Sequence, residues 1–127
     1  MEIRRSVDIE DEVRILLSEK YTVYCPPLPA DYSVPFLFVT ATGGSEASTI
    51  DTFSVALEAY SDSYAGANEL IREAVGYLKA KVAEQGSVVA YVVENTKPAL
   101  YQDPVRPDLM RYRTTLRIWC HQKKISI

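Results

Sequence analysis

The sequence predicts an α+β fold: a mostly antiparallel sheet of four or five strands, with two helices packed on one of its faces. Apolar and polar residues alternate over residues 52–60 and 111–121, which is typical of strands with one buried face. Over residues 63–84 the apolar residues instead repeat at helical spacing. The length of 127 residues fits one domain, so we expect residues 1–127 to fold as a single unit.

The first half of the chain predicts one helix and three strands. Asp8 can cap a short helix, because acidic residues follow it in the first turn, where they favour the positive end of the helix dipole. The apolar stripe of this helix is Ile9, Val13, Leu16 and Leu17. Strands are expected at residues 21–25, 36–41 and 52–60, with a proline-rich loop at 26–35 and a flexible glycine-containing hairpin tip at 43–48.

The second half predicts a long helix and two further strands, which completes the order α-β-β-β-α-β-β. The helix is expected over residues 63–84, with Gly86 as the residue that ends it. A strand at 88–93, a long loop at 97–108, a strand at 111–121 and a mobile tail at 122–127 follow. Two helices cannot cover both faces of such a sheet, so one face must be solvated or covered by another protein.

Composition excludes several classes of protein. The chain is 47% hydrophobic and 24% charged, as soluble globular proteins are. The net charge of −3 argues against binding to nucleic acid through bulk electrostatics. No apolar run approaches the roughly 20 residues of a membrane span, and the start of the chain lacks the pattern of a secretion signal. Cys25 and Cys120 fit neither a disulfide framework nor a zinc site, which favours reduced thiols in a cytoplasmic setting.

Residues that could carry catalysis or bind a metal are sparse. His121 is the sole histidine and has no acid near it in sequence, so no catalytic triad is indicated. The acidic residues 8–12 are more typical of a solvated helical turn than of a cation site. Gly43 and Gly44 lack the Lys-Ser/Thr pair of a phosphate-binding loop. We therefore expect no catalytic residue, no cofactor and no metal, and hence no enzyme.

The last predicted strand carries the main candidate for a binding surface. Arg111, Arg113 and Arg117 alternate along it, beside Trp119, so all point to one face. This face could be solvated, could contact nucleic acid or could bind protein, and arginine and tryptophan are favoured in protein interfaces. Complementary patches on one subunit would allow head-to-tail assembly, which can close into a ring. The candidate interface residues are Arg111, Arg113, Arg117, Trp119 and Tyr101 on the basic side, with Glu10, Asp11 and Glu12 on the acidic side.

The two proline-rich loops also carry apolar side chains. Leu28, Tyr32 and Val34 lie in the first loop, and Leu100, Tyr101, Val105 and Leu109 lie in or beside the second. Apolar groups on stiff loops cost little entropy to order when a partner covers them. Alternatively, these side chains fold back onto the core of their own subunit.

The whole pattern resembles the tail-terminator family of long-tailed phages and prophages. The likeness runs over residues 8–121: the opening helix at 11–17, the prolines before the strand at 36, the unit 51–60 followed by Ser61 and the long helix, and the closing strand at 112–119. The likeness lies in the length, the order of elements and the general pattern of residue types, without a diagnostic motif. The family implies helices on one side of a sheet and a hexameric ring that caps the tail tube and joins it to the head connector.

The resemblance also implies partners and a location. The chain would contact copies of itself, the tail-tube protein and a head-connector or stopper protein, and would bind neither a membrane nor specific nucleic acid. It would be found in the neck of the virion, and in the host cytoplasm during assembly.

Two other interpretations stay open. A head-closure subunit of the neck has a similar size, although such proteins tend toward barrel-like folds and the long amphipathic helix at 63–84 argues against one. A small ligand-binding domain or enzyme on a similar α+β sandwich would require a closed polar cleft, for example one that gathers Glu58, Arg113 and His121.

Overall fold

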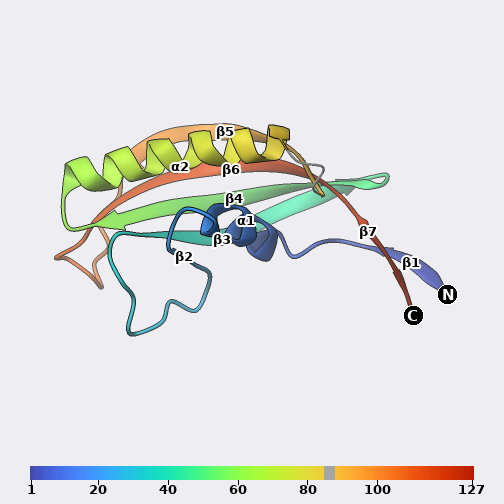
Figure 1. The fold of residues 1–127 in the computed structure, drawn as a ribbon, viewed down its shortest axis with the longest axis horizontal. Coiled ribbons are helices and arrows are strands. Elements are labelled where there is room, and N and C mark those ends of the chain that lie inside the picture. Colours follow the sequence, from blue (N-terminus) through green and yellow to red (C-terminus); the bar gives the residue numbers. More distant parts are fainter. Residues whose placement is uncertain (85–87) are drawn as a thin grey trace.

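The computed structural model describes residues 1–84 and 88–127, and the α+β class is confirmed (Figure 1). The described residues form two helices and seven strands. In chain order these are β1 (Glu2–Arg5), α1 (Ile9–Ser18), β2 (Val23–Tyr24), β3 (Phe36–Ala47), β4 (Ile50–Ser61), α2 (Tyr64–Glu84), β5 (Val89–Leu100), β6 (Met110–His121) and β7 (Lys123–Ser126).

The main sheet has five strands in the order β2-β3-β4-β6-β5. Its pairs β3–β4, β4–β6 and β6–β5 are antiparallel, as predicted, but β2 lies parallel to β3 and makes the sheet mixed. The physical reason is the connection between them. A tight hairpin would impose antiparallel pairing, whereas the long proline-rich loop after Tyr24 returns the chain so that β3 starts beside β2 and runs the same way.

The predicted order omitted two strands, and the predicted mobile tail was wrong. Residues 123–126 form β7, which pairs antiparallel with β1 so that Ile3 lies opposite Ile125. Neither strand has a strong local pattern, because the partner of each lies at the other end of the sequence. Figure 1 shows the resulting two-stranded ribbon projecting from the body of the molecule, with both chain ends at its tip.

The central strands are longer than predicted, so two predicted loops were partly wrong. β3 continues to Ala47, and the turn of the β3–β4 hairpin lies at residues 48–49, where Ser48 has a φ of 60°. The glycines belong to the strand: a Cβ added at Gly44 would lie 2.3 Å from the carbonyl oxygen of Thr52, so the two backbones approach too closely for a side chain. β5 likewise continues through Pro98 to Leu100, since an edge strand tolerates the missing N–H of proline.

The two helices follow the prediction closely. The carboxylate of Asp8 caps α1 by accepting a hydrogen bond from the backbone N–H of Asp11 at 3.4 Å. The predicted stripe of α1 is buried, as are Ala67, Ile71, Ala74, Val75, Leu78 and Val82 of α2. The predicted end of α2 at Gly86 lies outside the described residues. Neither helix is long and apolar enough to cross a bilayer, within the part of the chain that the structure describes.

Both helices pack on the same face of the sheet, called here the helix face. Their buried side chains join one hydrophobic cluster with Leu37 and Val39 of β3, Val55, Leu57 and Ala59 of β4, and Leu116, Ile118 and Cys120 of β6. These strand residues alternate along each strand, which is why the period-two pattern of the sequence identified them. Among the described residues, no helix covers the opposite face, called here the outer face.

One end of the outer face is covered by the chain itself. Phe36 and Tyr60 stack there with ring centroids 4.6 Å apart and enclose Leu109 in a second small cluster. Leu28 and Tyr32 of the first loop pack against the same cluster. The apolar loop residues therefore fall into two groups. Leu28 and Tyr32 fold back onto their own subunit, whereas Val34 and Val105 stay exposed.

Candidate protein-binding surface

The candidate surface is the outer face along β6 and the strands beside it. Leu116 and Ile118 are buried on the helix face, so Arg117 and Trp119 project to the outer face, as the alternation predicted. Arg117 lies opposite Ser54 of β4 and Val93 of β5, and Trp119 lies opposite Thr52 and Tyr91. The predicted basic residues thus share one face, but the structure gives them different surroundings.

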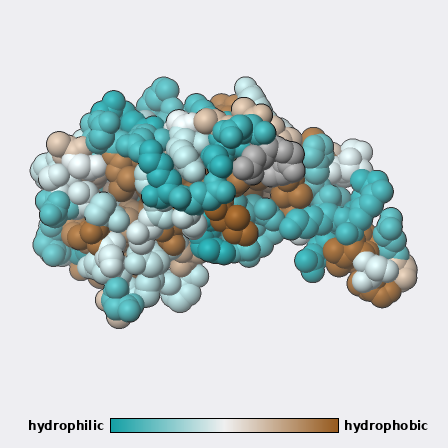
Figure 2. Space-filling view, in the orientation of Figure 1, coloured by the Kyte–Doolittle hydropathy of each residue, from teal (hydrophilic) through white to brown (hydrophobic). Residues whose placement is uncertain are grey.

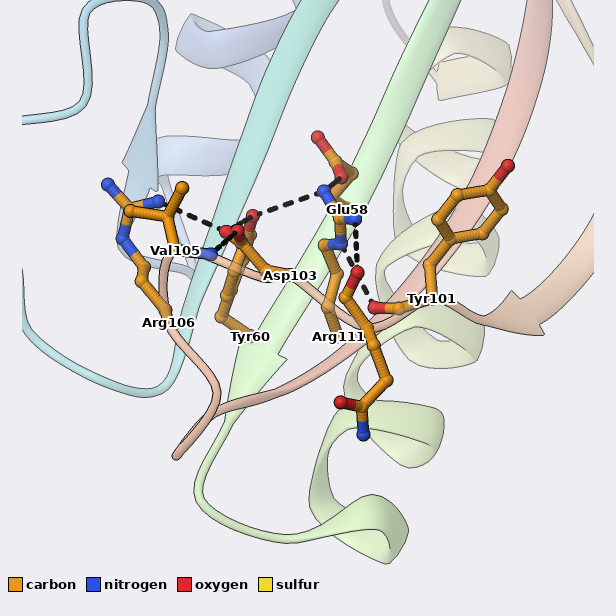
Figure 3. A network of polar contacts seen from close by, with 8 residues as sticks. Glu58, Tyr60, Tyr101, Asp103, Val105, Arg106 and Arg111 are labelled. Carbon is orange, nitrogen blue, oxygen red and sulfur yellow. Dashed lines mark hydrogen bonds and ion pairs between the residues drawn. The ribbon is translucent and has the colours of Figure 1, made fainter.

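Arg111 is engaged within its own subunit (Figure 3). Its Nη1 lies 2.7 Å from Oε2 of Glu58, and the two side chains are only 17% and 10% exposed. Its Nε and Nη2 donate hydrogen bonds of 3.0 Å to the backbone carbonyls of Tyr101 and Gln102. Burial acts to lower the pKa of Arg111, but Glu58, Tyr60 and Asp103 together outweigh it, and the pKa is raised. Arg111 therefore ties the chain after β5 to the centre of the sheet.

Asp103 holds the same loop a few residues further on. Its carboxylate accepts hydrogen bonds from Tyr60 Oη at 3.1 Å, Arg106 Nη1 at 3.0 Å and the backbone N–H of Val105 at 2.9 Å. Burial acts to raise the pKa of Asp103, yet these donors prevail and the pKa is lowered. Burial, reinforced by the nearby carboxylates, raises the pKa of Tyr60 to about 12. The two networks in Figure 3 thus fasten residues 101–109 over one end of the outer face.

Arg113 lies between this covered end and the open part of the face. Its guanidinium carbon is 5.5 Å from the centroid of the Tyr101 ring, a cation–π distance. Its Nε is buried without a hydrogen-bond partner among the described residues. Glu58, which lies opposite Arg113 in the β4–β6 register, gives its carboxylate to Arg111 instead.

The open part of the outer face is a shallow hollow around Arg117 and Trp119. Gly44, Ser45, Thr52 and Ser54 line the rest of it. Trp119 packs against Tyr91 with ring centroids 5.7 Å apart, and Tyr91 is 60% exposed. Arg117 is exposed and forms no ion pair within the described part of the chain. An accessible cation beside two aromatic rings is well suited to a protein contact.

The predicted acidic residues lie on α1, on the helix face, and the structure does not bring them near the basic strand. Oε2 of Glu10 accepts a hydrogen bond of 2.7 Å from the backbone N–H of Ala41, next to the β-bulge of β3. Asp11 pairs with Arg14 at 2.6 Å, and Glu12 pairs with Lys123 at 2.9 Å. All three acids therefore already have partners within the subunit. Contact of these acidic residues, or of the basic residues, with another subunit stays a prediction.

The cleft required by the enzyme interpretation does not form around the residues named for it. Glu58 and Arg113 face each other, but His121 lies opposite Ile50, close to the far end of the β3–β4 hairpin. Among residues 1–84 and 88–127 there is no group of three histidine, cysteine or acidic side chains that could hold a metal. A scan against protein-family models and a search of curated proteins both find no match for this chain.

The two cysteines are free thiols, as predicted. Cys120 is fully buried, and burial raises its pKa to about 12. Cys25 is half-buried, with a pKa raised to about 11, again chiefly by burial. Thiols with such high pKa values are mostly protonated at neutral pH and are weak nucleophiles.

Sequence reasoning missed the network around Glu58, Tyr60 and Asp103. One signal was available: Glu58 and Tyr60 occupy polar-face positions of β4, on the same face as the arginines of β6. The β4–β6 pairing needed to use that signal joins strands separated by a whole helix. Local periodicity could not supply it.

Proposed function

We propose that this protein is a structural subunit of a phage or prophage tail neck, a tail terminator. In this role it assembles with copies of itself into a ring that caps the tail tube and joins it to the head connector. Its partners are then the tail-tube protein and a head-connector or stopper protein, and its place is the neck of the virion. It has no catalytic role in this proposal.

The open hollow on the outer face carries the proposal. A sheet face with exposed Arg117 and Tyr91, and with the partly buried Trp119, beside small polar residues offers area, charge and aromatic anchors for another protein. In the described part of the chain, the helices shield the helix face, and the loops cover the end of the outer face near Tyr60. The hexameric state rests on the resemblance in element order alone.

The direct test is tube capping. Tail tubes assembled from the tube protein of the same phage would be incubated with the purified chain, and their ends inspected by negative-stain electron microscopy. We expect a ring at the tube end with the native chain and its loss with Trp119→Ala combined with Arg117→Glu. Arg72→Glu is the matched control, because Arg72 is an exposed cation on the opposite side of the molecule.

A genetic experiment tests the same proposal without purified components. Deletion of the gene from a phage that encodes it should give tails of uncontrolled length that fail to join heads. Tails of normal length that attach to heads in the deletion strain would exclude a tail terminator. Genes for a tail-tube and a tape-measure protein beside this one would support the proposal.

A further inference from the structure

The ribbon formed by the two ends of the chain has little to hold it in place. This terminal arm comprises residues 1–5 and 123–127, and is closed at its tip by hydrogen bonds between Met1 and Ile127. A two-stranded ribbon alone is at best marginally stable in water. Among the described residues, the Lys123–Glu12 pair is the one ion pair that links the arm to the body.

Two hydrogen bonds to a buried carboxylate fix the base of the arm. Asp51 of β4 is 3% exposed, and its two carboxylate oxygens accept hydrogen bonds from Ser6 at 2.6 Å and from Gln122 at 3.1 Å. These two residues stand at the points where β1 leaves the body and β7 begins. These two hydrogen bonds to Asp51 therefore set the direction of the arm, and the arm projects beyond them (Figure 1).

The arm has the composition of a binding element. Met1 is 81% and Ile127 is 70% exposed, and the register places Ile3 and Ile125 on the same side as these two residues. Figure 2 shows the resulting apolar tip. The arm carries four basic side chains and one acidic one, a net charge of +3. Arg4, Arg5 and Lys124 are exposed and form no ion pair in the part of the chain that the structure describes.

The opposite end of the molecule has the complementary composition. The loop end is defined here as residues 26–35, 62–63 and 101–109, and Figure 1 shows it farthest from the arm. It carries four acidic side chains and one basic one, a net charge of −3. Asp31, Asp62 and Asp108 are exposed and have no ion pair among residues 1–84 and 88–127. Beside them, Val105 is 76% exposed, and Val34 and Tyr101 are 41% and 50% exposed.

We propose that the terminal arm of one subunit docks on the loop end of a second copy of this chain. The arm cannot reach the loop end of its own subunit, because the two lie at opposite ends of the sheet (Figure 1). Three unpaired cations would meet three unpaired carboxylates, and the apolar tip would meet exposed apolar loop residues. Two different surfaces in contact make the assembly head-to-tail, which closes into a ring when the rotation between copies allows. This inference rests on the proposed ring and identifies its subunit contact.

Charge reversal tests the contact directly. The arm variant carries Arg4→Glu, Arg5→Glu and Lys124→Glu, and the loop variant carries Asp31→Lys, Asp62→Lys and Asp108→Lys. Each variant brings like charges together at its own arm–loop contact, so neither should associate with itself. A mixture should associate with the two variants alternating, because the native arm meets the native loop end and the reversed arm meets the reversed loop end. A chain with all six substitutions should associate again. Each single-surface variant should lose about a hundredfold or more in affinity, because like charges then face each other.

Sedimentation velocity at low ionic strength gives the readout, with circular dichroism to confirm that every variant is folded. Raised salt should weaken association of the native chain. The double variant Glu69→Lys and Arg72→Glu, which exchanges an exposed pair on α2, is the matched control and should associate like the native chain. Association of either single-surface variant at native strength, or a mixture that stays monomeric while the native chain assembles, would overturn the inference.

Cross-linking covers the case in which rings close only on the tube. A photoreactive benzoylphenylalanine at Val105 should capture arm peptides, and one at Ala80 on the exposed side of α2 should not. Mixing isotope-labelled with unlabelled chains shows that the captured peptide comes from another copy. Capture of tube peptides alone would overturn the inference while leaving the proposed function standing. Capture of the arm without any capping of tubes would instead refute the proposed function and leave this contact in place.

Discussion

The ion pair between Glu58 and Arg111 gives the sharpest test of the structure. Glu58→Ala removes the carboxylate 2.7 Å from Nη1 of Arg111 and leaves a cation that is only 17% exposed. Loss of one partner from a buried pair typically costs about 3–5 kcal/mol. Arg111 keeps two backbone carbonyl acceptors at 3.0 Å, so we place the cost at the low end, about 3 kcal/mol. For a domain of this size that is a large fraction of the roughly 5–15 kcal/mol of total stability.

Urea unfolding followed by the fluorescence of Trp119, the single tryptophan, measures this cost. Glu69→Ala is the control: Glu69 pairs with Arg72 at 3.0 Å, but the side chains are 71% and 60% exposed, so little change is expected. Glu58→Leu combined with Arg111→Met should be less damaging than Glu58→Ala alone, because no charge is left buried. A loss for Glu58→Ala no larger than that of the control would refute the buried network.

Other consequences of the structure are open to simpler measurements. Asp103→Asn should destabilise the protein most at neutral pH: the folded-state pKa of Asp103 is lowered, so its contribution is present above the unfolded pKa of about 4 and is lost as the pH falls below it. Urea unfolding of both forms from neutral pH to about pH 3 should show the difference shrinking, and a difference that grows in acid would contradict the assignment. Cys25 should react slowly with Ellman's reagent at pH 8 and Cys120 only after unfolding, since the pKa values of about 11 and 12 keep both thiols protonated. Fast labelling of Cys120 in the folded protein would show that β6 is not packed as described. Gly76→Ala should stabilise the protein by up to about 1 kcal/mol, because a Cβ there meets nothing within 4 Å in mid-helix. Gly44→Ala should destabilise it by about 1–3 kcal/mol through the contact with Thr52, and thermal unfolding of the two variants should show opposite shifts in Tm.

Features encoded in nearby residues could be predicted from the sequence. The cap at Asp8, the stripe of α1 and the buried face of β4 each depend on spacings of two to four residues, and each is found as expected. The same holds for the outward direction of Arg117 and Trp119, which follows from alternation along one strand. These local patterns also sufficed to predict the α+β class, because they identify the helices and strands and show that each has one apolar face to bury.

Features that depend on distant pairing could not be predicted. The parallel pairing of β2 with β3 depends on the path of the proline-rich loop, and the strand character of Gly43 and Gly44 depends on close approach to Thr52. Arg111 was expected at an interface because its type and position fit one, yet it bonds to residues 58, 101 and 102 of its own chain. Its partner Glu58 lies 53 positions away, beyond the reach of any periodicity.

The pairing of β1 with β7 orders events during synthesis. Among the strands described here, β1 is translated first and its partner β7 last, so residues 9–84 are available for folding before these two strands can pair. The body can therefore form early, whereas the arm forms only once residue 126 has been translated. In the proposed contact, a chain that stopped between residues 110 and 122 would present a loop end but no arm, so it could join one neighbour and not two. Closure of the proposed ring would therefore require chains that have been translated to the end of β7.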